Sequence, residues 1–446
     1  MRFRFAALAR AGLLLGAVAM LPAGTAGLAA VDARVSPQFA QLEMVYGLIK
    51  AHYVDQTDDN KLVEGAIDGM LASLDPHSAY LRGSSLQQIH TMIDGGYTGL
   101  GISVVPEDGA VKVVSPTRGS PAEKAGIKAG DYITHLDGKY IVDGDFDAAI
   151  EQMRGPVGTQ VRLTVYRAGR DAPLDITVTR AKIELEPVGG KLDGSIAVIT
   201  VNQFSADVGR LVAERLAKLR AEAGGKLTGV LLDLRSNPGG ELDEAVALSD
   251  LFLKSGVVVS QRGRQAGENV VYRAETYFAG DATNGLPLVV LIDAGSASAS
   301  EIVAGALQDQ HRALLMGDRS FGKGSVQTLI PIDQDHSVKL TTARYYTPSG
   351  RSIQAGGIEP DIRVPQISDP DARKRSQNAL RESDLRRHLI NEKGVDDKKL
   401  ESDAQADPRF KMTPEELTAK GIKDFQMWYA LETLRRAGAG KLVRSK

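Results

Sequence analysis

The chain has 446 residues, of which 43% are hydrophobic, so it is long enough to form more than one domain with a buried core. Its formal net charge of −2 argues against nucleic acid as a partner, and the absence of cysteine excludes disulfides, thiol catalysis and cysteine–zinc sites. The seven histidines form no metal-binding pattern, so we expect neither a metal nor another cofactor.

The first 29 residues have the pattern of an export signal. Arg2, Arg4 and Arg10 form a basic start, an uncharged stretch follows over 11–30, and small residues precede a cleavage position after Ala29. We therefore expect a cleaved signal peptide, residues 1–29, and export to the periplasm. The alternative is an uncleaved anchor in the inner membrane that faces the periplasm, because an apolar run of about 20 residues can span a bilayer.

Next come a helical region and a β-rich module. Apolar residues at helical spacing predict an N-terminal helical region over 30–95, which Leu74–Ser78 interrupts. Residues 96–182 change to short β-rich runs with helical stretches at 121–125 and 146–153, which predicts a small β-barrel-like module. The strands expected in this module are 101–105, 111–114, 132–135, 161–166 and 174–178.

Residues 183–365 alternate apolar runs with helical stretches, which indicates an α/β core. The continuous apolar runs are those expected of strands buried on both faces. The expected strands are 196–201, 230–234 and 288–292, and the expected helices are 207–221, 241–253 and 299–309. The region 366–446 is highly charged, which predicts a solvated linker and a final amphipathic helix over 414–437 that contains the only tryptophan, Trp428.

Two stretches crowded with small residues contain a candidate catalytic pair, Ser298 and Lys323. A serine nucleophile needs a base, and a lysine can serve if burial lowers its pKa from about 10.4. Serine–lysine pairs are a known variant of the serine hydrolases. Ser298 is expected at a strand-to-helix turn, where the N–H of Ala299 can stabilise an oxyanion. A second donor can come from Gly239 or Gly240, in the turn after strand 230–234.

The same residues have other interpretations. A serine at a helix start is commonly only a cap, and a lysine in a loop commonly faces water. Gly317–Lys323 fits the phosphate-loop pattern, but Gly324 takes the place of the hydroxyl residue that binds magnesium. A non-catalytic peptide-binding scaffold would be expected to have a broken pair. A serine–histidine hydrolase would draw on one of three histidines, His77, His311 or His336.

Three segments resemble the C-terminal processing (tail-specific) serine proteases. They are Asp233–Gly240, Gly295–Glu301 with Gln308 and Asp309 behind it, and Phe321–Gln327. The resemblance covers roughly residues 36–365. It implies the following roles: Ser298 as nucleophile, Lys323 as base, Gln327 as the glutamine that supports the lysine, and the amides of Ala299 and of Gly239 or Gly240 as oxyanion donors.

The β-rich module resembles a PDZ domain, which is a partly open β-barrel. The residues similar to its carboxylate-binding loop are Gly99, Leu100, Gly101 and Ile102, and they stand before Ser120–Ile127 and Gly130–Ile133, a run common in bacterial PDZ domains. Amides in such a loop can capture a terminal carboxylate while the next strand pairs with an extended peptide. In some relatives an arginine of this domain meets the glutamine and gates the site. Arg154 resembles that arginine, although it can equally be a surface charge.

The sequence thus predicts a multidomain α/β protein: a protease core with an inserted PDZ domain and helical flanks at both ends. The expected activity is that of a secreted endopeptidase that captures substrates with apolar C-termini and cuts them through an acyl-enzyme on Ser298. The resemblance further implies a homo-oligomer built through the helical flanks. It also implies dependence on an adaptor protein, such as a repeat-containing lipoprotein.

Overall fold

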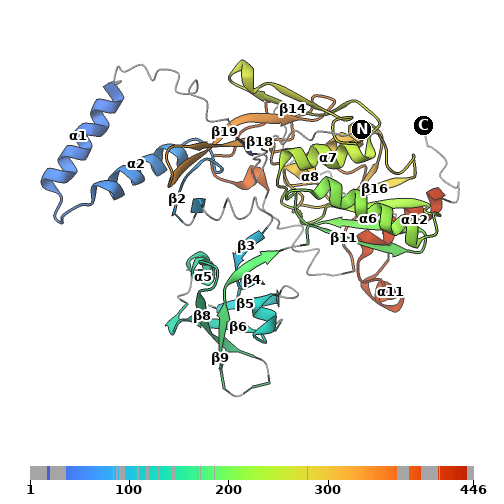
Figure 1. The fold of residues 1–446 in the computed structure, drawn as a ribbon, viewed down its shortest axis with the longest axis horizontal. Helices are drawn as coiled ribbons and strands as arrows, with labels where there is room; N and C mark the ends of the chain where they lie inside the picture. The colour runs from blue at the N-terminus through green and yellow to red at the C-terminus, as the bar shows by residue number, and fades with distance from the viewer. Residues whose placement is uncertain are drawn as a thin grey trace, which may run out of the picture. The chain divides into compact units, whose positions relative to one another are not determined.

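The computed structural model describes residues 18–20, 37–83, 85, 86, 89, 96–107, 110–116, 120–128, 130–141, 146–167, 169, 170, 172–184, 186–278, 280–368, 381–392, 410 and 412–438. The chain divides into two compact units, one of Met1–Arg82 with Pro187–Lys446 and one of Gly83–Glu186 (Figure 1). The smaller unit is therefore an insertion within the larger one. Of the predicted signal peptide, only β1 (Val18–Met20) is described, and the rest lies outside the described residues.

The smaller unit is built on an antiparallel sheet with a buried apolar core. Its strands, in spatial order, are β4 (Ile102–Glu107), β5 (Ala110–Pro116), β6 (Tyr132–Leu136), β8 (Gln160–Tyr166) and β9 (Leu174–Thr179), with β7 (Lys139–Tyr140) beside β6. Two helices, α4 (Pro121–Lys124) and α5 (Phe146–Met153), accompany it, and β3 (Gly96–Gly99) pairs with β10 (Ala181–Glu184). The strands and helices predicted for this module are confirmed. Val113, Ile133 and Leu163 are fully buried, as expected for alternating strands that cover one core.

The larger unit begins with two helices, α1 (Pro37–His52) and α2 (Asp59–Ala72). Asp58 caps α2 by accepting from the N–H of Asn60 at 2.9 Å. The predicted helical region over 30–95, with its interruption at Leu74–Ser78, is wrong at Ala79–Arg82, which form β2 and pair with β19 (His336–Tyr346). The Asp75 carboxylate accepts from the N–H groups of the turn that follows it, so the chain turns there and enters the strand.

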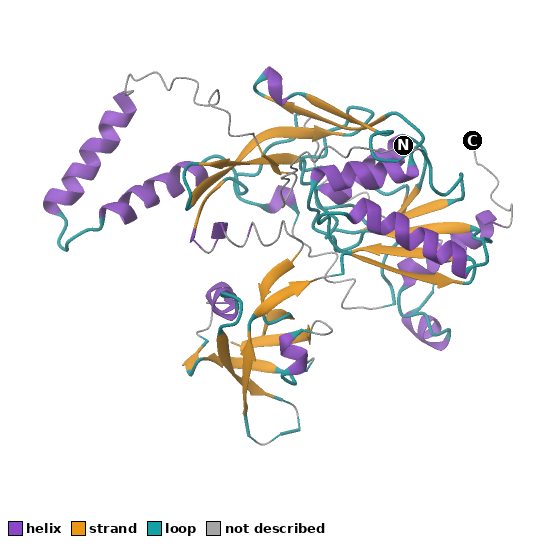
Figure 2. Cartoon of the chain, in the orientation of Figure 1, coloured by secondary structure: helices purple, strands orange, loops and turns teal. Residues whose placement is uncertain are grey.

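A largely parallel sheet forms the centre of the larger unit (Figure 2). Its order is β11 (Val188–Asp193), β12 (Ile196–Val201), β13 (Gly229–Asp233), β16 (Leu288–Ile292), β17 (Leu314–Gly317) and β20 (Ile362–Arg363), with only β11 antiparallel. The helices of one face are α6 (Val208–Glu222), α7 (Leu242–Phe252) and α8 (Ala299–Asp309). Val230 and Leu232 face this cluster, whereas Leu231 faces the opposite one, as the alternation of side chains along a strand requires.

The opposite face is covered by the C-terminal helices α11 (Pro414–Ala419) and α12 (Phe425–Gly438). The prediction of one continuous helix over 414–437 is wrong. Gly421, with a φ of +67°, interrupts it, because a left-handed residue ends an α-helix. Phe425 and Leu434 then pack α12 against the sheet.

A second sheet was not predicted. It joins β18 (Ser325–Pro331), β19, β14 (Val257–Gly263) and β15 (Val270–Arg273) as antiparallel neighbours, with β1 parallel to β18 and β2 paired with β19. Two short 3₁₀ helices, η1 (Ala266–Glu268) and η2 (Glu382–Asp384), complete the elements used below. Because β18 starts two residues after Lys323, this sheet holds the candidate base.

Candidate active site

Ser298 stands between β16 and α8 in a strained backbone conformation. Its φ of +54° is rare for a non-glycine residue and costs about 1–3 kcal/mol, so the surrounding structure must impose it. Two contacts do so: the N–H of Ala297 donates to the carbonyl of Asn237 at 3.0 Å, and the N–H of Ser298 donates to Glu301 Oε2 at 2.7 Å.

The hydroxyl of Ser298 makes no capping hydrogen bond, although the residue occupies the N-cap position of α8. Ser298 is fully buried, and its Oγ has no hydrogen-bond partner among the described residues. A buried polar atom without a partner is unfavourable, so such an atom points to a role outside packing. The interpretation of Ser298 as a simple cap therefore does not hold.

Lys323 lies in a loop whose glycines allow close packing. A Cβ at Gly324 would lie 2.3 Å from the backbone N of Gln354, and one at Gly322 would lie 3.0 Å from Ala355 C. Lys323 as a residue is half-buried, while its amine lies among protein atoms.

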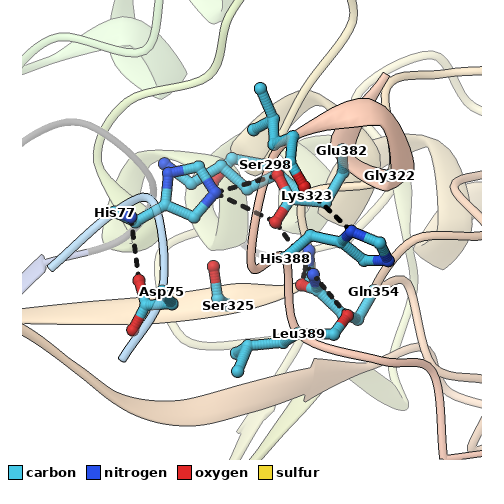
Figure 3. A network of polar contacts seen from close by, with 12 residues as sticks. Asp75, His77, Ser298, Gly322, Lys323, Ser325, Gln354, Glu382, His388 and Leu389 are labelled. Carbon is cyan, nitrogen blue, oxygen red and sulfur yellow. Dashed lines mark hydrogen bonds and ion pairs between the residues drawn. The ribbon is translucent and has the colours of Figure 1, made fainter. Parts of the chain in front are cut away.

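The pKa of Lys323 is lowered to about 8, chiefly by burial and in addition by the Lys339 ammonium. Three carboxylates act in the opposite direction: Glu382, Glu301 and Asp75. Figure 3 shows Ser298 and Lys323 in one close-up with Glu382. A substantial fraction of Lys323 is therefore neutral near pH 8, as a base must be.

The carboxylate of Glu301 joins the two candidate segments. Its Oε2 accepts from the N–H of Ser298 at 2.7 Å and from the N–H of Lys323 at 2.9 Å. Its Oε1 accepts from Ser320 Oγ at 2.5 Å and from the N–H of Gly322 at 2.7 Å. Glu301 is fully buried, and that burial raises its pKa to about 7 against the opposing effect of these bonds. In the sequence, this role was visible only as an acidic residue three positions after the serine.

The turn after β13 lies against Ser298. A Cβ at Gly239 would stand 2.9 Å from the Cβ of Ser298 and 2.7 Å from the carbonyl oxygen of Ala297, so only glycine fits there. The N–H of Gly239 donates to Asn237 Oδ1 at 2.9 Å. Within the described chain, the N–H groups of Gly240 and Ala299 have no acceptor. The two glycines that the sequence offered as oxyanion donors therefore differ: the N–H of Gly239 is already bonded, and that of Gly240 is not bonded within the described residues.

Gln327 lies on β18, fully buried. Its Nε2 donates to Ser325 Oγ at 3.0 Å and to Thr341 Oγ1 at 3.2 Å, and its Oε1 has no hydrogen-bond partner among the described residues. The amide is thus held by its nitrogen, and its oxygen remains available to a donor.

The alternative chemistries find little support in these contacts. In the phosphate-loop interpretation the amides of 317–323 would face a ligand, but those of Gly322 and Lys323 donate to Glu301 and that of Phe321 donates to the carbonyl of Ser296. Of the three histidines considered, His77 contacts Glu382 at 2.8 Å, His336 contacts Asp333 at 2.8 Å, and His311 occupies the turn after α8. None of these contacts reaches Ser298 Oγ, which has no partner in the described structure.

In the smaller unit, the predicted peptide-binding loop runs from Gly99 through Leu100 and Gly101 to Ile102. Gly101 has a φ of +75°, and a Cβ there would lie 2.3 Å from the Cβ of Ser120, so glycine is required. Ile102 begins β4, which is the outermost strand of its sheet among the described strands. Arg154 directly follows α5 and is half-buried.

Comparison with known proteins matches each of the two units to a known family of domains. The model of peptidase family S41 matches residues 195–364, that of the PDZ domain matches 98–178, and that of the "Activating protease CtpB N-terminal domain" matches 24–84. The chain is 45% identical over 356 residues to the carboxy-terminal-processing protease of Bartonella bacilliformis, an alignment that covers 79% of this chain and 80% of that protein. The chain belongs to peptidase family S41, the carboxy-terminal processing serine proteases.

A second relative agrees with this membership. The carboxy-terminal processing protease CtpA of Bacillus subtilis is 37% identical over 329 residues, which cover 73% of this chain and 69% of that protein. Among solved structures, the photosystem II D1 C-terminal processing protease is 28% identical, covers 75% of this chain and 87% of its own, and superposes with a TM-score of 0.49. The expected multidomain α/β protease fold with a PDZ domain and helical ends is confirmed. None of the described helices is both long and apolar enough to cross a membrane.

Proposed function

We propose that this chain is an exported endopeptidase that processes the C-termini of proteins with a Ser298–Lys323 dyad. The observation that carries the proposal is the buried Ser298 hydroxyl without a partner among the described residues. Glu301 accepts from the backbone N–H of Ser298 and from that of Lys323, the lysine whose pKa burial lowers to about 8. Both features cost free energy, and together they suit a nucleophile and its base.

In the proposed reaction, neutral Lys323 takes the proton of Ser298 Oγ as the oxygen attacks the carbonyl carbon of the scissile peptide. The N–H groups of Ala299 and Gly240 donate to the oxyanion of the tetrahedral intermediate. We choose Gly240 because the N–H of Gly239 is bonded to Asn237. The intermediate collapses to the acyl-enzyme as Lys323 returns the proton to the leaving amine. Lys323 then removes a proton from the water that hydrolyses the ester.

Gln327 is proposed to orient Lys323 through its Oε1, the one polar atom of its amide without a partner among the described residues. Arg154 is proposed to gate the site by engaging Gln327 when a substrate tail is bound. The measurement that checks this gate is the stimulation of cleavage by an added C-terminal peptide. Arg154→Ala should abolish that stimulation, whereas unchanged stimulation would reject the gate.

The PDZ domain is proposed to capture the substrate's C-terminal carboxylate with the amides of the 99–102 loop, while β4 pairs with the extended tail. The outermost position of β4 and the glycine requirement at 101 support this proposal. An apolar final side chain is the expected ligand.

Assembly and location are further proposals. Helix α1 buries none of its residues, and its exposed apolar side chains are Phe39, Leu42, Met44, Val45 and Leu48. We propose that a second copy of the chain covers this face, with the C-terminal helices as the other flank of the oligomer and an adaptor protein recruiting the substrate. The proposed location is the periplasm, after cleavage behind Ala29, with retention by an uncleaved anchor as the alternative.

The test is cleavage of an unfolded protein with an apolar C-terminus by wild type, Ser298→Ala and Lys323→Ala. Each catalytic variant should lose about a thousandfold or more in kcat/KM. Circular dichroism shows whether each variant is folded, and the exposed Lys254→Ala serves as the matched control with wild-type activity. If folded Ser298→Ala or Lys323→Ala cuts as fast as wild type, the dyad is rejected.

A further inference from the structure

A segment beyond the family S41 match contacts the loop of the candidate base. Residues 381–392, here called the strap, lie in the region where a solvated linker was expected, and the S41 match ends at 364. Yet Arg381, Glu382 and Asn391 are buried. A buried charged residue requires partners, and several partners of these residues lie in the loop that precedes Lys323.

The strap is tied to the three residues that precede Gly322 and Lys323. Arg381 Nη1 donates to the carbonyls of Arg319 and Ser320, both at 2.9 Å. The N–H of Glu382 donates to the carbonyl of Phe321 at 3.2 Å. The backbone on one side of Lys323 is therefore fixed by the strap.

A series of side-chain contacts fixes the backbone on the other side of Lys323, and Figure 3 shows two of its members, Glu382 and Gln354. Glu382, fully buried, accepts from Gln354 Nε2 at 2.9 Å through its Oε1, and Gln354 Oε1 in turn accepts from the N–H of Gly324 at 3.0 Å. Asn391 Nδ2, at the far end of the strap, donates to the carbonyl of Gln354 at 2.7 Å. The strap thus contacts residues 319–321 on one side of the lysine and, through Gln354, Gly324 on the other.

The Glu382 carboxylate also acts on the lysine by charge. It lies 2.8 Å from His77 Nε2, and it favours the ammonium form of Lys323, whereas burial and Lys339 on β19 disfavour that form. The other charged groups that act on the lysine are Glu301 on α8 and Asp75 after α2, both of which favour the ammonium form. Glu382 is the one of these carboxylates that comes from outside the S41 match and its N-terminal neighbour domain.

We propose that Glu382 is a positioning residue that both holds the Lys323 loop and restrains the lysine from losing its proton, so that the strap sets the pH range in which the protease works. The inference rests on the proposed Ser298–Lys323 dyad. In this proposal, the 381–392 strap changes the pH at which Lys323 loses its proton and does not itself contact the substrate.

The test follows the charge of Lys323 directly, by NMR of protein labelled with ¹³C at the lysine side chains. Ser298→Ala, in the full chain, prevents self-cleavage, and the Lys323 signal is the one that Lys323→Met removes. Glu382→Gln keeps the size of the side chain and one acceptor oxygen but removes its charge. We expect it to lower the titration midpoint of Lys323 by roughly half to one pH unit.

Glu392→Gln is the matched control. It makes the same chemical change in the same strap, where Glu392 accepts from Arg344 at 2.7 Å and from Tyr346 at 2.8 Å. It should leave the Lys323 midpoint unchanged. An unchanged midpoint in folded Glu382→Gln, or an equal shift in Glu392→Gln, overturns the proposal. If Glu382→Gln does not fold, the neutral and unbranched Glu382→Met is titrated in its place, with the same expectation.

Kinetics give a second readout that a purely structural role would not move. The kcat/KM profile of Glu382→Gln should shift to lower pH by the same amount as the NMR midpoint, raising the rate at pH 6.5 three- to tenfold relative to its own plateau. A uniform loss at all pH values would contradict the proposed effect on the proton. Failure of the dyad itself would show separately, because Lys323→Ala would then still cut.

Discussion

Two glycine-rich regions of this protein use the same residue type for different purposes. Around Ser298, Gly239 and Gly324 let backbone segments meet at distances that no Cβ permits, and the amides there are mostly bonded. In the PDZ domain, Gly101 allows a left-handed turn in front of β4, an edge strand. In the proposed mechanism, the first region fixes the reacting groups, while the second presents backbone to a ligand. Substitutions in the first region should therefore lower kcat, and substitutions in the second should raise KM for a substrate that binds through its C-terminus.

The largest effect is expected at Gly324. Gly324→Ala would place a Cβ 2.3 Å from the backbone of Gln354, so the Lys323 loop must move. We expect a loss of more than about a hundredfold in kcat, because a shift of about 1 Å in a catalytic group has such an effect. Steady-state kinetics measure it, with Gly267→Ala as the control, since a Cβ there meets nothing within 4 Å. Wild-type kcat in Gly324→Ala would mean that the loop is not a rigid support.

The next prediction concerns the free energy of unfolding, which should depend on pH through the ionisation of Glu301. Its pKa is raised by burial to about 7 from an ordinary 4.5, so the folded protein binds a proton that the unfolded chain releases. Its contribution to stability is therefore present below pH 4.5 and is lost as pH rises to 7, by an amount on the order of 3 kcal/mol.

Glu301→Gln should remove this dependence. The measurement is urea unfolding of Ser298→Ala at pH 5 and pH 7.5, with and without Glu301→Gln, in which the difference between the two proteins isolates the carboxyl group. An identical pH dependence in both proteins would show that Glu301 does not titrate in this range.

A smaller effect is expected in the PDZ domain. Gly101→Ala introduces a Cβ 2.3 Å from that of Ser120 at a φ of +75°, which distorts the carboxylate loop. KM for a protein substrate with a free apolar C-terminus should rise about tenfold, with kcat within about twofold, because the interaction is used for binding alone. A substrate whose C-terminus is amidated provides the control, and its KM should be the same in wild type and variant. A fall in kcat with unchanged KM would contradict the separation of the two regions.

The parts that the sequence predicted well are those set by local patterns. The strands 196–201 and 288–292 and the helix over 299–309 match β12, β16 and α8, because uninterrupted apolar runs and helical periodicity suffice to specify them. The second sheet was missed in part because β2 and β14 each pair with β19 across a large sequence separation, which a local pattern does not show. The break at Gly421 was missed because a glycine interrupts a helical pattern only through its backbone conformation.

The residues of the candidate site also fall into two groups, those that the local sequence indicated and those that it did not. Ser298 and Lys323 were singled out because their small neighbours are visible in the sequence. Glu301 and Glu382 were not assigned roles, because a carboxylate gains such a role only when distant loops fold over it: residues 320–323 over Glu301 and the strap over the Lys323 loop. The proposed choice of Gly240 over Gly239 likewise depends on one hydrogen bond, which the N–H of Gly239 donates to Asn237 Oδ1.

The most direct test of the central claim is the pH dependence of kcat/KM for the wild-type protease from pH 6 to pH 10. A lysine base with a pKa lowered to about 8 predicts a rate that rises with pH, with a midpoint near 8, and then levels off. A rate that falls steadily from pH 6 to pH 9 while the protein remains folded would contradict Lys323 as the base.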